Sequence, residues 1–322
     1  MRLPVLALLC AVARADEIVV RDFEGRPVPE AAVRVLLVRR NYPFSDGSEL
    51  VSGVTDERGR WDFRPGAMHV SRVHVDKAGH HIVRMEGLAV PRTPVRDVIL
   101  PRMGEAVPLH CRRAEESLPG HALSGVVAYD LERGDLVAPG HRGEKPDLML
   151  RVDARLVRWA GGKSEPEVQA LLAKEKDPKE RKILLLTHGH WDTSVELTFA
   201  ADGDGILEHA YAPYAWLRLP STAPVSGYAG KSTFLGQDGV DRKRGFFLRV
   251  RTVKDAAGNV VSANYAKFYG EPAASPGMFT FQYYYNPRPN DRRLEMDVQR
   301  NLQKPVPADD WEEKFNTRAT YP

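Results

Sequence analysis

Three residues near the middle of the chain have the types and the spacing of metal ligands. His188, His190 and Asp192 follow an apolar run at residues 183–186. Two imidazoles two positions apart on an extended turn can bind one zinc ion, and the carboxylate is placed for a second metal or for holding the attacking water. One interpretation of this spacing is a hydrolytic metal site, and it depends on the elements that carry the three residues.

The residues before the motif predict a helix and then a strand. Residues 164–167 form a capping box with a proline near the first helical position, which indicates a helix of about ten residues. A proline turn then leads to a predicted strand at residues 183–187. This succession, ending in Thr-His-Gly-His-Trp-Asp, resembles the zinc-binding entry motif of the metallo-β-lactamase fold hydrolases. The resemblance implies a zinc hydrolase with the three residues as metal ligands.

Three departures count against a working hydrolase. Thr193 stands where the family has a further histidine, and the only histidine after His190 is His209. Residues 193–200 alternate as a strand does, whereas the family motif opens a helix. Because catalytic zinc usually keeps three protein ligands, two imidazoles fall short. We therefore expect no catalytic, cofactor-binding or metal-binding residues, and the alternative is a zinc hydrolase with a degenerate motif.

The first fifteen residues have the pattern of a secretory signal peptide. Arg2 supplies a positive start, residues 3–12 are a short apolar core, and residues 13–15 form a small-x-small cleavage pattern, so we expect the mature chain to begin at Asp16. The apolar core is far shorter than the roughly 20 residues that span a bilayer, and no later stretch approaches that length. The sequence therefore predicts a secreted or periplasmic protein without a membrane span.

Charge and cysteine content exclude further classes. Loss of Arg2 and Arg14 with the signal peptide reduces the 46 basic residues to 44, against 43 acidic ones, a net charge of +1. This balance leaves no large excess of positive charge, which binding to nucleic acid or to an anionic membrane would need. Because Cys10 lies in the same segment, Cys111 is the only thiol left, and no internal disulfide can form. We expect Cys111 to be a small buried hydrophobic residue and no cofactor to bind.

Residues 16–100 show strand periods and turn chemistry. Apolar residues alternate at residues 33–37, a glycine turn precedes Trp61 and Phe63, which share one face, and a later apolar strand ends before Gly79. The succession Asp-x-x-Gly-x-Pro-Val-x-x-Ala-x-Val, Thr-Asp-x-x-Gly-x-Trp-x-Phe and Val-x-Val resembles the carboxypeptidase regulatory-like domain, a transthyretin-type β-sandwich. The resemblance implies an accessory module without catalytic residues.

Two other groups of candidate ligands have simpler interpretations. His80 and His81 are adjacent, and adjacent residues of a strand point to opposite faces, so we expect a pair beside a turn. Asp202 and Asp204 have a calcium-loop pattern. An EF-hand loop also needs a bidentate acid about seven residues further on, where Tyr211 stands, and two flanking helices. We expect a turn between strands there.

Residues 101–305 predict a second β-sandwich with one short helix inserted, and residues 306–322 a C-terminal tail. The clearest hairpin joins residues 244–254 to residues 260–269. The next strand carries aromatic residues on one face, which can stack sugar rings but more commonly form the core. We expect Phe279, Phe281 and Tyr283 in the core, with Tyr285 on the same face and Tyr284 on the opposite one.

The last part of this domain, residues 247–253, 264–270 and 284–295, resembles a group of uncharacterised secreted bacterial proteins. Those proteins commonly pair a regulatory-like module with this β-rich region, and the resemblance implies strands and turns rather than a site. The sequence as a whole predicts a mainly β protein of two β-sandwich domains. We expect a secreted non-catalytic binding or surface-structural component of unknown ligand. Its partner would be a cell-surface polysaccharide or a protein, and not a nucleic acid.

Overall fold

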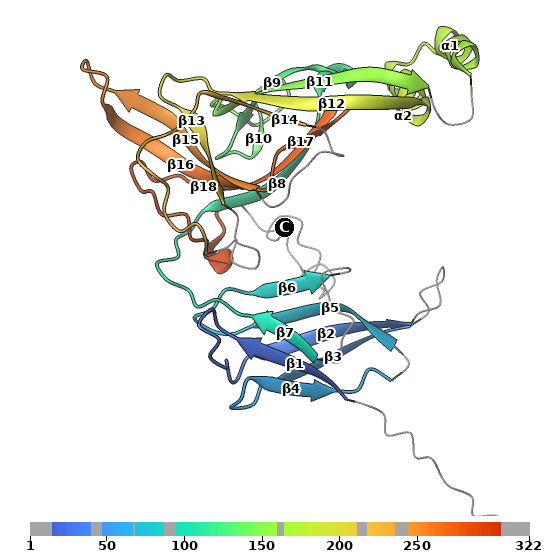
Figure 1. Ribbon diagram of the computed structural model, residues 1–322. Helices are drawn as coiled ribbons and strands as arrows, with labels where there is room; N and C mark the ends of the chain where they lie inside the picture. The colour runs from blue at the N-terminus through green and yellow to red at the C-terminus, as the bar shows by residue number, and fades with distance from the viewer. Residues whose placement is uncertain are drawn as a thin grey trace, which may run out of the picture. The chain divides into compact units, whose positions relative to one another are not determined.

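The computed structural model describes residues 15–39, 47–66, 68–86, 95–159, 164–210, 218–235 and 244–303. The chain divides after Gly104 into two compact units, and most of the regular structure described is β-strand (Figure 1). The mainly β fold class predicted from the sequence is confirmed. Apart from Ala15, the predicted signal peptide lies outside the described residues, and so does the predicted tail at residues 306–322.

The first unit contains two sheets. One has the strand order β4-β1-β7, with β1 and β7 parallel, and the other is an antiparallel sheet of order β3-β2-β5-β6 (Figure 1). The strands are β1 (Asp16–Arg21), β2 (Ala32–Arg39), β3 (Ser48–Val54), β4 (Arg60–Phe63), β5 (Met68–Asp76), β6 (Val83–Glu86) and β7 (Val95–Ile99).

Side-chain alternation along these strands builds the core of the first unit. Val33, Val35 and Leu37 of β2 are at most 1% exposed, because every second residue of a strand faces the same side. The predicted pair Trp61 and Phe63 is confirmed, since the two rings stack with centroids 5.2 Å apart and 14° between planes. These features establish a β-sandwich; membership in the carboxypeptidase regulatory-like family stays a prediction.

The second unit is a larger sandwich. One sheet has the order β10-β9-β11-β12-β14, and the other has the order β13-β15-β16-β18-β17, with β8 also paired to β18. Its strands are β8 (His110–Ser117), β9 (Gly125–Asp130), β10 (Asp135–Leu136), β11 (Leu148–Trp159), β12 (Gly189–Thr198), β13 (Gly205–Ala210), β14 (Lys231–Leu235), β15 (Arg244–Lys254), β16 (Val260–Tyr269), β17 (Ala273–Ser275) and β18 (Met278–Asn286). The described part of this unit also contains the 3-10 helices η2 (Pro119–His121) and η4 (Val298–Arg300).

The aromatic stripe of β18 lies in the core between these sheets, as predicted. Phe279, Phe281, Tyr283 and Tyr285 are at most 4% exposed, and Phe281 packs edge-on against Tyr129 of the opposite sheet with centroids 5.1 Å apart. Burial of each ring contributes about 2–3 kcal/mol to folding. The predicted hairpin is also confirmed as β15 and β16.

The segment between β11 and β12 differs from the prediction. It contains two helices, α1 (Glu165–Lys174) and α2 (Pro178–His188), where one helix and a strand at residues 183–187 were predicted. Asp177 caps α2 by accepting the Lys179 N–H at 2.8 Å, and Pro178 suits its first turn. A short apolar run fits a helix as well as a strand, and here it continues the helix that begins at the Asp177 cap. Figure 1 shows both helices at the end of the long β11–β12 pair.

Candidate functional site

The three predicted metal ligands lie on two different elements. His188 is the last residue of α2 and is buried, whereas His190 lies on β12 and is exposed. Asp192 follows on β12, also exposed, and its carboxylate accepts a hydrogen bond from Arg155 of β11 at 3.0 Å. The expectation that an extended turn holds His188 and His190 on one side is wrong, because the helix α2 ends at His188 and the strand β12 begins at Gly189.

The junction between α2 and β12 is fixed by packing. The Trp191 indole donates a hydrogen bond to the Leu185 carbonyl at 3.3 Å, and a Cβ on Gly189 would lie 2.4 Å from the indole nitrogen. Strand alternation then turns His190 to the same face as Asp192, away from Trp191. Among the residues described, no group of three or more His, Cys, Asp or Glu is arranged to hold a metal ion.

The remaining candidate ligands also have structural roles. His80 closes a turn by donating its N–H to the Lys77 carbonyl at 3.0 Å, as expected for a pair beside a turn. The predicted turn at Asp202 and Asp204 is confirmed between β12 and β13. Asp204 accepts the N–H of Thr252 at 2.8 Å, and Asp202 accepts a hydrogen bond from the Lys254 amine at 2.7 Å. His209 lies on β13, in the other sheet from His190.

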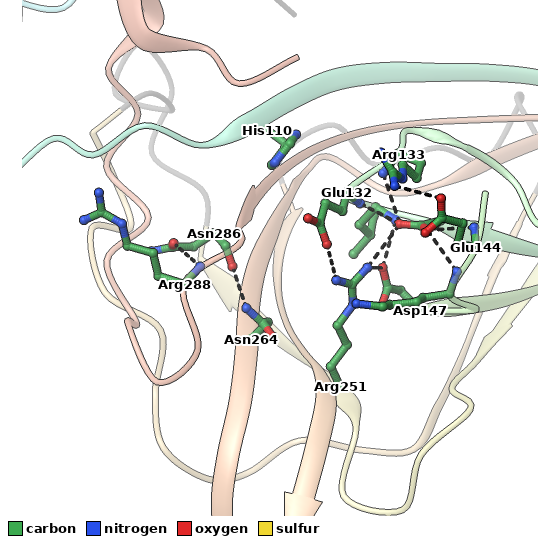
Figure 2. Close-up of polar contacts among 12 residues, drawn as sticks. His110, Glu132, Arg133, Glu144, Asp147, Arg251, Asn264, Asn286 and Arg288 are labelled. Atoms are coloured by element: carbon green, nitrogen blue, oxygen red, sulfur yellow. Dashed lines mark hydrogen bonds and ion pairs between the residues drawn. The ribbon is translucent and has the colours of Figure 1, made fainter. Parts of the chain in front are cut away.

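A polar cluster that the sequence did not predict surrounds Arg251 of β15 (Figure 2). Its guanidinium meets the Asp147 carboxylate at two points, with Nε to Oδ1 at 2.7 Å and Nη2 to Oδ2 at 2.9 Å. Nη2 also lies 3.1 Å from Asp130, and Nη1 contacts Glu132. Parallel N–H donors matched to one carboxylate are among the strongest polar contacts in proteins. Arg251 therefore joins the sheet that contains β15 to residues 130–147, the segment between β9 and β11 of the other sheet.

Backbone donors complete this cluster. Asp130 accepts the N–H groups of Glu132, Arg133, Glu144 and Lys145 at 2.9–3.1 Å. Burial opposes ionisation of Asp130, but these donors hold its pKa below the ordinary value. For Asp147, in contrast, burial outweighs Arg251 and raises the pKa.

The contacts of this cluster join β15 of one sheet to residues 130–147 beside the other sheet. Each of its three carboxylates meets the guanidinium of Arg251, and burial lowers the pKa of the neighbouring His110 imidazole. In Figure 2 no dashed line joins His110 to these carboxylates, and the charges of Glu132 and Asp130 only partly offset the effect of burial on its pKa. Arg251 itself has a φ of 57°, a left-handed conformation that costs energy for a side chain other than glycine. No local pattern marks Arg251, because the three carboxylates that its guanidinium meets are more than 100 positions away.

A second buried polar group lies on the opposite face of the β15–β16–β18–β8 sheet. Lys267 is 2% exposed and stands beside Tyr284, which stands beside Cys111 on the next strand. The Tyr284 hydroxyl accepts a hydrogen bond from Gln282 at 3.2 Å. Burial raises the pKa of the Cys111 thiol to about 12, so the thiol is protonated and unreactive. Cys111 is thus the buried small residue that was predicted.

Comparison with known proteins does not assign the chain to a family. No family model and no curated protein matches the chain. Among solved structures, the chain is similar to a mutant of the shaft pilin SpaA from Lactobacillus rhamnosus GG. The identity is 10%, the match covers 75% of this chain and 89% of the pilin, and the TM-score is 0.19. In the described part of the chain, no helix is long and apolar enough to cross a membrane.

Proposed function

We propose that this protein is a secreted, non-catalytic β-protein that serves as a binding or surface-structural component. The observation that supports the proposal most directly is the separation of the one chemically suggestive motif. His188 ends a helix and is buried, whereas His190 and Asp192 project from an exposed strand face. A zinc-activated water needs ligands that converge on one point, and these side chains diverge.

The charged clusters support the same proposal. The buried carboxylates around Arg251 are engaged by N–H donors, which fits a role in fixing loops between sheets. A general base needs a carboxylate or imidazole within reach of a substrate proton and with a pKa suited to its task. A sandwich with these charged groups committed in this way suits a scaffold that presents a surface to a polysaccharide or protein.

Metal analysis tests the non-catalytic proposal. Protein purified without a His-tag is expected to contain well below one metal ion per chain, and chelator is expected to leave its melting midpoint in place. An integral zinc site would stabilise the fold by on the order of 10 kcal/mol, so chelator would lower that midpoint strongly. The double variant His188→Ala with His190→Ala is measured beside His69→Ala, which removes an exposed histidine of β5.

The opposite outcome is equally clear. One or two tightly held metal ions per chain, lost in the double variant but kept in His69→Ala, would establish a metal site at the motif. Hydrolysis of a generic ester or lactam that disappears with the metal would make the protein a zinc hydrolase. Export is tested separately by N-terminal sequencing of protein secreted from a bacterial host. We expect Asp-Glu-Ile, and a retained Met1 would exclude cleavage after Ala15.

A further inference from the structure

Strand β3 forms one edge of the four-stranded sheet in the first unit. Its ladder with β2 is regular over all seven residues of β3. Just before β3, the Arg39 N–H of β2 donates to the Gly47 carbonyl at 3.3 Å, which places the backbone groups of Gly47 on the β2 side. Because these groups alternate between the two edges of a strand, the residues at even positions of β3 point theirs away from β2. They are Ser48, Leu50, Ser52 and Val54.

The outward edge of β3 is open. None of the seven residues of β3 is buried, and among the described strands only β2 pairs with it. Val51 packs against the core, so the residues at even positions have their side chains on the outer face. Two of these, Leu50 and Val54, are apolar and are 39% and 58% exposed. Unpaired N–H and C=O groups beside exposed apolar side chains form a template for another strand.

Several other edges of the described sheets are protected against strand addition. Arg60 and Asp62 are exposed on β4, and Lys231 is exposed at the start of β14. The edge of β13 is occupied, because Ala229 and Ile206 exchange two backbone hydrogen bonds at 2.8 and 2.9 Å. Charged side chains, proline and bulges are the usual means of protecting an edge. Strand β3 contains no lysine, arginine or proline, and its ladder has no bulge.

We propose that β3 pairs with β3 of a second copy of this chain, antiparallel and around a two-fold axis at Ser52. In this register Leu50 lies opposite Val54 of the partner subunit, so the exposed apolar side chains of the two copies cover one another. Glu49, the one charged residue of β3, lies opposite Thr55 of the partner subunit, so no like charges are opposed. This pairing does not depend on the proposed function.

Other registers fit these side chains less well. A two-fold axis at Val51 places Leu50 opposite Ser52, and an axis at Leu50 leaves Val54 beyond the partner strand. The axis at Ser52 forms three pairs of outward-pointing residues, which exchange about six hydrogen bonds. Because both copies use the same edge, the pairing closes at a dimer and does not continue into a fibre.

Sedimentation equilibrium of the full chain over a range of concentrations tests whether the dimer forms. The average mass is expected to rise with concentration from that of one chain towards that of two. Leu50→Lys puts a charge against the partner's Val54 at both ends of the pair and should raise the dissociation constant by about tenfold. Leu235→Lys is the control, because it changes an exposed leucine at the edge of β14 and should leave the dissociation constant unchanged.

Cross-linking tests the register. With Ser52→Cys, the two introduced thiols belong to one hydrogen-bonded pair, whose Cα atoms lie about 5.5 Å apart and within disulfide range. Ser48→Cys is the matched control on the same edge, because it lies opposite Asp56 of the partner subunit and its two copies are roughly 26 Å apart. Cys111 is buried, and Cys10→Ser in both variants removes the other thiol. Mild oxidation should give a covalent dimer with Ser52→Cys alone.

Three outcomes would overturn the proposal. The mass of one chain at every concentration excludes the dimer, and this measurement needs no variant to fold. Equal cross-linking of Ser52→Cys and Ser48→Cys excludes the register. A dimer that Leu50→Lys and Leu235→Lys weaken equally, or that neither weakens, is held by another surface than β3.

Discussion

The Nε atom of Arg251 lies 2.7 Å from Oδ1 of Asp147, a residue 104 positions earlier in the chain. Asp147 precedes β11 of one sheet and Arg251 belongs to β15 of the other. The side chain of Asp147 is 1% exposed, so its charge is stable only with this partner and with the Leu131 N–H that it also accepts, at 2.9 Å. The contact thus joins the two sheets through charged groups, beside the apolar core that contains Leu131 and Leu148.

Arg251→Met is expected to destabilise the protein by about 3–5 kcal/mol, because it leaves the buried carboxylates of Asp130 and Asp147 without their cation. Asp147 already has a raised pKa, so it can take up a proton when Arg251 is lost. The loss should therefore be larger at pH 8 than at pH 5. Urea unfolding at both pH values measures it.

The matched control is Arg155→Met, which breaks an exposed ion pair with Asp192 and should change stability by less than about 1 kcal/mol. Equal effects of the two substitutions would mean that the cluster around Arg251 is not a structural clamp. A smaller loss in Arg251→Lys is also expected, since an ammonium cannot reproduce the two parallel contacts to Asp147.

The hydrogen bonds of Asp135 predict how the stability of the second unit changes at acid pH. Burial opposes its ionisation, yet His141, Arg142 and the Leu136 N–H donate hydrogen bonds at 2.8–3.2 Å and lower its pKa to about 2. Because the folded pKa is below the unfolded value of 3.8, this stabilisation is present above pH 3.8 and is lost as the pH falls through 2. After a discount for solvent screening it amounts to about 1 kcal/mol.

Asp135→Asn should therefore lower the free energy of unfolding by about 1 kcal/mol at pH 6, with little difference from the unmodified protein near pH 2. Guanidinium unfolding at a series of pH values gives both numbers. Asp202→Asn serves as the control, because its carboxylate is exposed and pairs with a surface lysine. A constant difference between Asp135→Asn and the unmodified protein from pH 6 to pH 2 would contradict the assigned role.

The sequence predicted the features that depend on local periodicity. The alternation of Phe279, Phe281 and Tyr283 and the turn between β15 and β16 are visible within a few residues, and both are confirmed. The run at residues 183–187 carries no such information, since four apolar residues fit either period, and it forms a helix. Arg251 and Lys267 could not be found in this way. Their environments are set by strand pairing and by coil segments distant in the chain.

Gly53 in the first unit tests whether the Trp61–Phe63 stack stabilises that sandwich. A Cβ on Gly53 would lie 2.0 Å from the Trp61 indole nitrogen, so Gly53→Ala has to displace the indole from Phe63. Overpacking of this kind costs about 1–3 kcal/mol. Gly230→Ala is the control, because a Cβ there would meet nothing within 4 Å.

A double-mutant cycle separates this clash from the general effect of an alanine in strand β3. When Trp61→Ala is already present, Gly53→Ala should cost little or nothing, because the atoms that it would meet are gone. The interaction energy between the two substitutions should then approach the full cost of Gly53→Ala alone. Thermal unfolding of the four proteins, followed by near-ultraviolet circular dichroism, provides the measurement. Additive effects of the two substitutions would show that the indole does not occupy the space over Gly53 in solution.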